Sequence, residues 1–150
     1  MRRNAVLAAS LLAHAKCAAF DRMDELRVMQ DNDHGTFKDL SDDKEVLEVT
    51  TKTQRCILHF YHQDFRRCQI MDKHLQKLAK KYFKTRFARM DVEKAPFLVE
   101  RMKIQMLPCV VLFKDGIAVD RVVGFEELGN TDNFTLRTLE RRLAREGRQW

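Results

Sequence analysis

The sequence has little of what marks membrane proteins or small secreted proteins. No run of apolar residues approaches the roughly 20 that a helix needs to span a bilayer, so we predict no membrane contact. The cysteines are scattered among mostly apolar residues, at Cys17, Cys56, Cys68 and Cys109. This pattern differs from the dense disulfide framework of a small secreted protein and indicates reduced thiols in a reducing compartment. We therefore predict a cytoplasmic protein, with the nucleus left open as a second location.

Motifs for metal, nucleotide and hydrolytic chemistry are also absent. No two cysteines have the spacing of zinc ligands, and His59 and His62 lie near Cys56 without a second pair of ligands. The sequence contains no phosphate-binding loop of the Gly-x-x-x-x-Gly-Lys-Ser/Thr type and no Ser/His/Asp set at a family-specific spacing. We predict no bound metal and no cofactor, and direct nucleotide hydrolysis has no support.

The chain carries an excess of positive charge without a nucleic-acid motif. Its 150 residues have a formal net charge of +6 at pH 7. Basic and acidic residues are interleaved, and no aromatic-basic motif of a nucleic-acid module appears. We predict that the chain binds no nucleic acid, whereas electrostatic attraction of an acidic protein partner stays open.

The amino-terminal part has a pattern of its own. Residues 4–30 are rich in Ala, Leu, Met, Arg and Glu and contain no Pro or Gly, which predicts a helix. Its apolar residues form one stripe that should dock on the domain or on a partner: Leu7, Leu11, Leu12, Ala15, Ala19, Met23 and Leu26. A short signal peptide is the alternative, because Arg2 and Arg3 precede an apolar run. A polar run over 31–35 ends the pattern, so we predict a helical extension over 1–35 and one domain over 36–150.

Strand and helix patterns alternate from residue 36 onward. Ser41 is the predicted N-cap of the first helix here, and Pro96 fits the first turn of a later one. Gly124 marks a bulge or a close backbone approach. In order, we predict strand 36–40, helix 41–51, strand 55–61, helix 67–83, strand 86–91, helix 96–101, strand 109–113, strand 118–123 and a last helix ending near 146. This order predicts an α/β fold, a three-layer sandwich around a mixed central sheet.

The predicted helix over 67–83 has two contrasting faces. Its inner face is mostly apolar and carries Ile70, Met71, His74, Leu75 and Leu78. Its outer face is basic and carries Lys73, Lys77, Lys80, Lys81 and Lys84. By default, a basic outer face of this kind is simply solvated.

The stretch between Cys56 and Pro108 organises the rest of the chain. An apolar strand ends at Tyr61, a polar turn follows, and a helix then begins with Cys68 near its start. Pro108 stands much later, before another apolar strand. This arrangement resembles a thioredoxin active site, where a Cys-x-x-Cys pair occupies the turn. Here Phe65 holds the first cysteine position and only Cys68 remains, so the dithiol is missing.

Longer runs resemble the phosducin-like branch of the thioredoxin superfamily. They cover about residues 36–146, and the most specific are Val92-Glu93-Lys94-Ala95-Pro96-Phe97 and Gly129-Asn130-Thr131-Asp132. The resemblance implies a thioredoxin-like fold with a cis Leu107–Pro108 bond. It also implies a non-catalytic co-chaperone or adaptor that binds the cytosolic chaperonin containing TCP-1 and modulates folding of actin or tubulin. We expect contacts through the amino-terminal helix and through charged faces that carry Lys77, Lys81, Arg137, Arg141 and Arg145.

Cys68 has two interpretations that the sequence leaves open. The helix N-terminus with Arg66 and Arg67 would lower its pKa and make it a reactive thiol, alone or in a disulfide with Cys109. A buried cysteine is more often a small apolar filler. By resemblance, His59 stands where thioredoxins keep a buried acid, which argues against ordinary reductase chemistry. The active-site-like loop thus comprises Phe65, Arg66, Arg67, Cys68 and Pro108, and a single-cysteine redox protein is the alternative function.

Overall fold

The computed structural model describes residues 22–145, and the chain divides into two units, residues 1–33 and 34–150. In the first unit a helix covers residues 22–31, which confirms this part of the predicted helix. Met23 and Leu26, the described members of the predicted stripe, are 63% and 43% exposed. The rest of that stripe and the signal-peptide alternative fall outside the described residues. No helix within 22–145 is long and apolar enough to cross a membrane.

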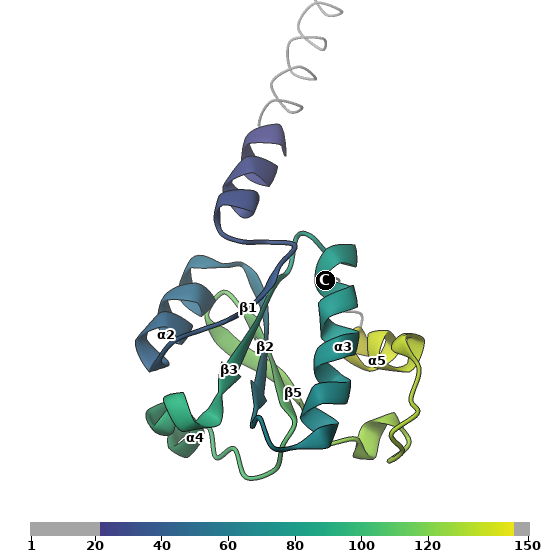
Figure 1. Cartoon of the computed structure of the whole chain (residues 1–150). Coiled ribbons are helices and arrows are strands. Elements are labelled where there is room, and N and C mark those ends of the chain that lie inside the picture. Colours follow the sequence, from purple (N-terminus) through teal and green to yellow (C-terminus); the bar gives the residue numbers. More distant parts are fainter. Residues whose placement is uncertain (1–21, 146–150) are drawn as a thin grey trace, which may run out of the picture. The chain divides into compact units, whose positions relative to one another are not determined.

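The second unit alternates strands and helices in the predicted order (Figure 1). Its first half contains β1 (Phe37–Asp39), α2 (Asp43–Lys52), β2 (Arg55–Tyr61), α3 (Arg66–Lys81) and β3 (Arg86–Asp91). Its second half contains η1 (Val92–Lys94), α4 (Pro96–Arg101), β4 (Cys109–Lys114), β5 (Ile117–Val123), η2 (Glu126–Leu128) and α5 (Leu136–Leu143). Each predicted strand of this unit is therefore present, with bounds shifted by one or two residues at most.

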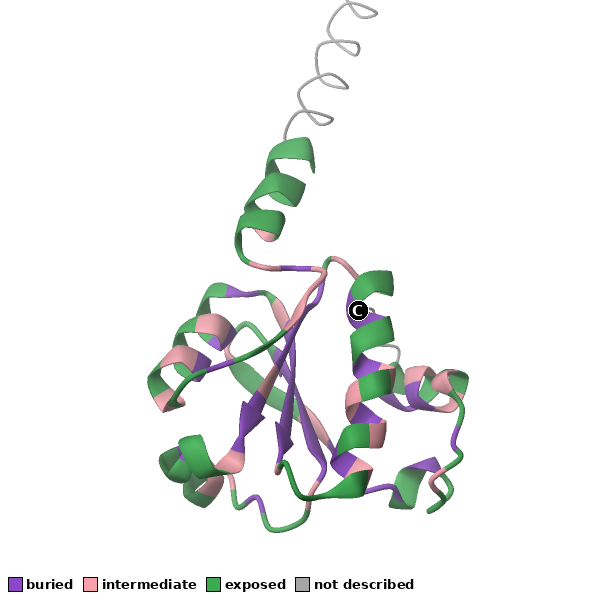
Figure 2. Cartoon of the chain, viewed as in Figure 1, coloured by how far each residue is buried: buried purple, intermediate pink, exposed green. Residues whose placement is uncertain are grey.

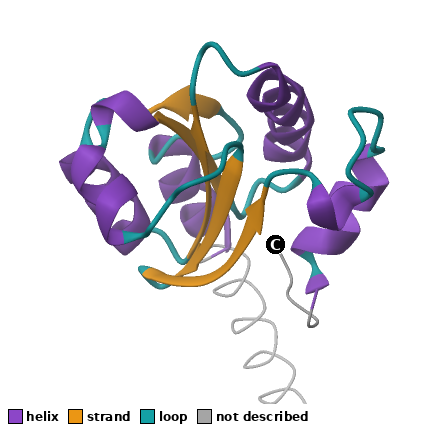
Figure 3. Ribbon diagram, turned by 90° about the horizontal axis from the view of Figure 1, so that it is seen from below, coloured by secondary structure: helices purple, strands orange, loops and turns teal. Residues whose placement is uncertain are grey.

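The strands form one sheet in the order β1-β3-β2-β4-β5, with β2 at its centre. Strand β3 runs parallel to both β1 and β2, whereas β4 runs antiparallel to β2 and β5. Helices cover both faces of the sheet (Figure 3). This is the predicted three-layer α/β sandwich with a mixed sheet, and its parallel part places the ends of β2 and β3 at one edge.

Alternate residues of β2 serve two separate cores, as expected for a strand buried on both faces. Ile57 packs in a cluster with Met71, Leu75 and other residues beneath α3 and α5. Leu58 and its neighbours on the opposite face pack in a second cluster beneath α2 and α4. Figure 2 shows β2, β3 and β4 mostly buried, whereas the edge strands β1 and β5 and the outer faces of the helices carry exposed residues. The sheet is thus a rigid base for the loops at its edge.

The helix ends differ from the predictions in ways that local hydrogen bonds explain. Asp42, rather than Ser41, caps α2, because its side chain accepts from the Glu45 backbone N–H at 2.8 Å. Ser41 instead donates its own backbone N–H to the Glu45 carboxylate at 2.8 Å, which is a reciprocal capping arrangement. The last helix begins at Leu136 and ends at Leu143, earlier than predicted.

Gly124 makes the predicted close approach, and the sheet irregularity lies elsewhere, between Leu112 and Phe113. Gly124 has φ +58, and a Cβ at this position would lie 3.1 Å from Met106 Sδ. Its backbone N–H donates to the Pro108 carbonyl at 2.8 Å. A side chain here would therefore displace Met106 and strain the backbone.

Candidate functional site

Phe65 occupies the N-cap position of α3, at the end of the turn that follows β2. Its side chain is 47% exposed, and its ring centroid lies 5.3 Å from that of His62. The backbone N–H of Cys68 donates to the Phe65 carbonyl at 3.1 Å, which places Cys68 in the first turn of the helix. The turn thus presents an exposed aromatic ring at the position that the sequence assigns to an attacking thiol.

Cys68 and Cys109 are both free thiols, each 1% exposed. Burial raises the pKa of Cys68; a backbone hydrogen bond at His62 opposes this rise, and the Asp72 carboxylate adds to it. This raised pKa is the opposite of what the reactive-thiol interpretation requires and agrees with the interpretation of Cys68 as a buried filler. Burial also raises the pKa of Cys109. The structure has no Cys68–Cys109 disulfide, and both thiols belong to the packed interior.

Pro108 directly precedes β4, whose first residue, Cys109, pairs with Phe60 near the end of β2. The Leu107–Pro108 bond is cis, as predicted. Pro108 itself is buried, whereas Met106 is 49% exposed and covers Gly124. The loop before β4 therefore offers a second exposed apolar side chain in addition to Phe65.

Arg66 and Arg67 differ sharply in their surroundings. Arg66 is exposed. Arg67 Nε donates to Asp132 Oδ1 at 3.0 Å, and its Nη1 donates to Asn130 Oδ1 at 3.3 Å. Its guanidinium also lies 4.8 Å from the centroid of the Phe125 ring, which is a cation–π contact. Arg67 therefore holds the turn at residues 129–132 against the start of α3, a role that the sequence did not predict.

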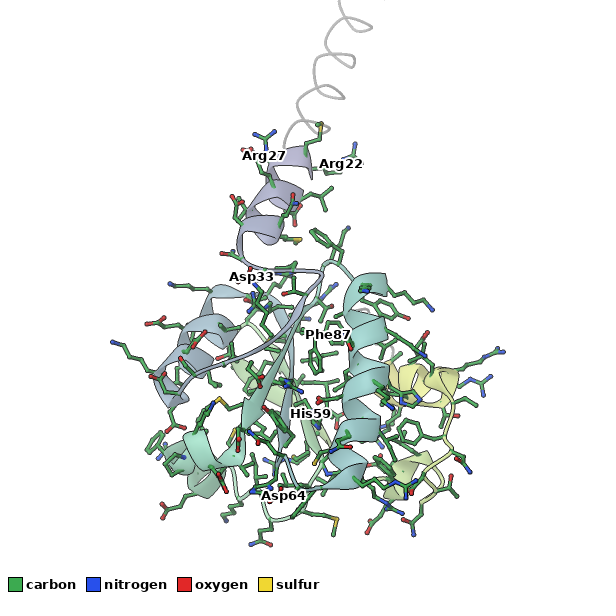
Figure 4. The ribbon with its side chains drawn as sticks, in the orientation of Figure 1. Arg22, Arg27, Asp33, His59, Asp64 and Phe87 are labelled. Carbon is green, nitrogen blue, oxygen red and sulfur yellow. The ribbon has the colours of Figure 1, made fainter. Side chains whose placement is uncertain are left out.

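His62 forms a polar cluster at the edge of the turn. Its Nε2 lies 2.8 Å from Glu93 Oε1, and the Asp64 backbone N–H donates to its Nδ1 at 3.1 Å. Nδ1 therefore accepts, and the Nε2–H group donates a hydrogen bond to the Glu93 carboxylate. The hydrogen bond to Glu93 raises the pKa of His62. Figure 4 shows Asp64 at the outer edge of this loop and His59 in the interior.

His59 is fully buried and makes one strong polar contact. Its Nδ1 lies 2.7 Å from Asp72 Oδ1 on α3. Burial lowers the pKa of His59, although the hydrogen bond to Asp72 opposes this. The neutral ring therefore donates from Nδ1, and its Nε2 has no hydrogen-bond partner within the described part of the chain. This arrangement differs from a buried carboxylic acid, which can give or take a proton at either oxygen.

Three strands and α3 extend the His59 contact into a network. Asp72 also pairs with Arg89, which lies opposite His59 in the parallel register of β2 and β3. Arg89 Nη2 donates to Asp39 Oδ2 at 2.8 Å, and the Tyr61 hydroxyl donates to the same carboxylate. The Arg89 guanidinium lies 4.6 Å from the Tyr61 ring centroid. The network holds the short edge strand β1 to the centre of the sheet.

Residues 37–135 match the family description "Thioredoxin". This chain belongs to the thioredoxin family. A solved mutant thioredoxin from Halobacterium salinarum has a TM-score of 0.64 and 20% identity, covering 78% of this chain and 96% of that one. At that identity the likeness shows the fold alone.

Among thioredoxin-family proteins, this chain is similar to several with phosducin-like names. It is 47% identical over 114 residues to thioredoxin domain-containing protein PLP3A of Arabidopsis thaliana, covering 76% of this chain and 49% of that protein. It is 44% identical over 111 residues to human thioredoxin domain-containing protein 9, covering 74% and 49%. It is 41% identical over 116 residues to phosducin-like protein 3 of Drosophila melanogaster, covering 77% and 54%. These matches confirm the predicted branch, and the chain spans about half the length of the curated relatives it matches.

The residues predicted to contact a partner divide into two groups in this thioredoxin-family chain. Lys77, Arg137 and Arg141 are exposed. Lys81 Nζ instead lies 3.0 Å from the Glu140 carboxylate, and Arg145 lies 3.0 Å from Glu127. All five are exposed, and Lys81 and Arg145 additionally pair with acids of the same domain.

The site lacks the parts that a thioredoxin-family reductase needs. Dithiol exchange requires an exposed thiolate to attack and a second thiol to resolve the mixed disulfide. Phe65 has no thiol, and Cys68 is buried with a raised pKa. No group of three or more His, Cys, Asp or Glu residues within 22–145 is arranged to hold a metal ion. What the loop does offer is exposed apolar and basic surface on a rigid fold.

Proposed function

We propose that this chain is a non-catalytic thioredoxin-family co-chaperone, an adaptor that binds the cytosolic chaperonin and modulates folding of actin or tubulin. The observation that carries the proposal is the replacement of the attacking thiol by Phe65, with Cys68 buried behind it. The names of the relatives, among them phosducin-like protein 3, support the assignment. We place this activity in the cytoplasm and propose no role for nucleic acid or membrane.

The contacts would come from the helix in the extension, residues 1–35, and from charged faces of the domain, residues 36–150. Met23 and Leu26 are exposed apolar residues on the described part of that helix. A helix with an exposed apolar face gains stability by covering it. On the domain, Lys77, Arg137 and Arg141 are exposed cations that can meet an acidic surface.

A pull-down with purified cytosolic chaperonin tests this function. The wild-type chain should retain the chaperonin at low salt and release part of it at high salt, because exposed charges are screened. The double variant Met23→Glu and Leu26→Glu should lose most of the binding, since it places charge on the apolar face. A matched double variant on exposed polar positions of the same helix, Arg22→Glu and Arg27→Glu, separates the apolar contact from the charge contact. Chaperonin retained equally by all three chains at every salt concentration would contradict the proposal.

A further inference from the structure

The outer face of α3 carries one continuous line of cations and amides. Its exposed positions repeat every three or four residues, which places them on a single face of the helix. We call this set the α3 stripe; it consists of Arg66, Gln69, Lys73, Gln76, Lys77 and Lys80. It extends over the 15 residues from Arg66 to Lys80, which is roughly 21 Å along the axis. The buried residues Met71, Leu75 and Leu78 lie on the opposite face of the helix.

The acids that flank the α3 stripe are engaged elsewhere. Asp72, the only acidic residue in α3, pairs with His59 and Arg89 on the sheet. On the other flank, Glu140 accepts from Lys81 and from the Tyr82 hydroxyl at 2.9 Å. The cations of the stripe have no ion pair with any residue in 22–145. Their charge is therefore left uncompensated by the fold.

This arrangement is unfavourable for the isolated helix. Lys73 and Lys77 are four residues apart and Lys77 and Lys80 are three apart, so like charges face each other along the stripe. Such pairs destabilise a helix, whereas a glutamate in the same place would stabilise it. An external anion on the stripe would remove this repulsion.

We infer that the α3 stripe is a docking surface for an acidic helical segment of a partner protein. Carboxylates at the same spacing of three and four residues on a facing helix would lie opposite the lysines. The stripe contains no aromatic side chain, so it lacks the stacking platforms that single-stranded nucleic acid uses. The inference rests on the proposed adaptor function and names the surface and the chemistry through which it would act.

A labelled peptide tests the inference without the chaperonin. The probe is a capped alanine-based peptide of about 18 residues with glutamates at spacings of three and four, long enough to be helical. Its binding is measured by fluorescence anisotropy at about 50 mM and about 300 mM salt. We expect the wild-type chain to bind it at low salt and the double variant Lys77→Glu and Lys80→Glu to bind at least about tenfold more weakly. The double variant Lys94→Glu and Lys114→Glu makes the same charge change at exposed positions off the stripe and should bind within about twofold of wild type.

Other results of this experiment would indicate misfolding, a non-helical occupant or a nucleic-acid ligand. The stripe variant should unfold at nearly the same temperature as wild type, because both positions are exposed and the new carboxylates gain Lys73, Lys81 and Lys84 as neighbours while they repel each other. A loss of binding would then not reflect misfolding. Equal weakening by both double variants, or equal binding of a proline-containing peptide of the same charge, would overturn a helical occupant on this stripe. Tighter binding of a short oligonucleotide through the same lysines would assign the surface to nucleic acid instead. Peptide binding with no chaperonin retained would leave the stripe assigned and reject the proposed function.

Discussion

Arg67 and Asp132 are joined by a hydrogen bond of 3.0 Å although they lie 65 positions apart in the chain. The same guanidinium contacts Asn130 and covers the Phe125 ring. One side chain of the active-site-like loop therefore anchors the turn over residues 129–132, one of the two most specific runs of the sequence. This side chain of the loop therefore has a structural role.

Arg67→Ala should destabilise the domain by about 1–2 kcal/mol, because it removes a partly exposed ion pair and a cation–π contact. Urea unfolding followed by circular dichroism measures the change. Arg66→Ala is the matched control, since Arg66 is exposed, and its effect should stay within about 0.5 kcal/mol. Equal losses from both variants would show that the contact to Asp132 contributes nothing.

Phe65→Cys should create a working dithiol in the existing fold. The new thiol would stand at an exposed helix N-terminus, which favours the thiolate, with Cys68 behind it to resolve the mixed disulfide. Insulin-disulfide reduction should be absent in the wild-type protein, present in Phe65→Cys, and lost again in the double variant Phe65→Cys and Cys68→Ser. Turnover by the wild-type protein that Cys68→Ser abolishes would instead support the single-cysteine redox alternative.

The described thiols should react only when the protein opens. Burial raises the pKa of Cys56 to about 12 and also raises the pKa of Cys68 and Cys109. In a Cys17→Ser background, modification by a chromogenic disulfide reagent at pH 8 should be at least about a hundredfold slower than in denaturant, because attack needs an exposed thiolate. Rapid labelling of a thiol in the folded protein would contradict the burial of that site.

His59 should make the domain less stable in mild acid. Burial lowers its folded pKa below the ordinary value of 6.5, so the unfolded chain binds the proton more readily. The stability that neutral His59 contributes is complete above pH 6.5 and is lost as the pH falls through the lowered folded pKa. His59→Gln should flatten the fall in unfolding free energy between about pH 7 and pH 5, by at most about 1.4 kcal/mol per pH unit. The measurement is urea unfolding at a series of pH values.

His62 provides a control, because its pKa is shifted in the opposite direction to that of His59. Its hydrogen bond to Glu93 raises the folded pKa, so its contribution is present below the unfolded pKa and is lost as the pH rises through the folded value. His62→Gln should therefore remove stability at acid pH and leave the acid-side fall due to His59 in place. The same direction of change in both variants would refute the assignment of the acid sensitivity to His59.

Local sequence patterns predicted the helices and strands well. They did not predict the side-chain contacts that depend on which strands pair and in which register. The apolar run of β2 and the proline of α4 predicted their elements because these signals depend on neighbouring residues. The contact of Asp72 with both His59 and Arg89 depends on the pairing of β2 with β3, which no local pattern specifies. The choice between the two interpretations of Cys68 could not be made for the same reason. The helix terminus and the arginines are visible in the sequence, whereas the burial that raises the pKa comes from the assembled fold.

The strand order has a consequence for synthesis of the protein. Central strand β2 pairs with β3, which follows it soon, and with β4, which follows only after residue 108. A nascent chain ending near Arg101 would therefore expose one edge of its most apolar strand, and such edges pair with other chains. We expect ribosome-bound chains to become resistant to protease only after β5 has left the exit tunnel. Resistance at a length ending near Arg101 would show that β1, β2 and β3 hold together with their helices without β4.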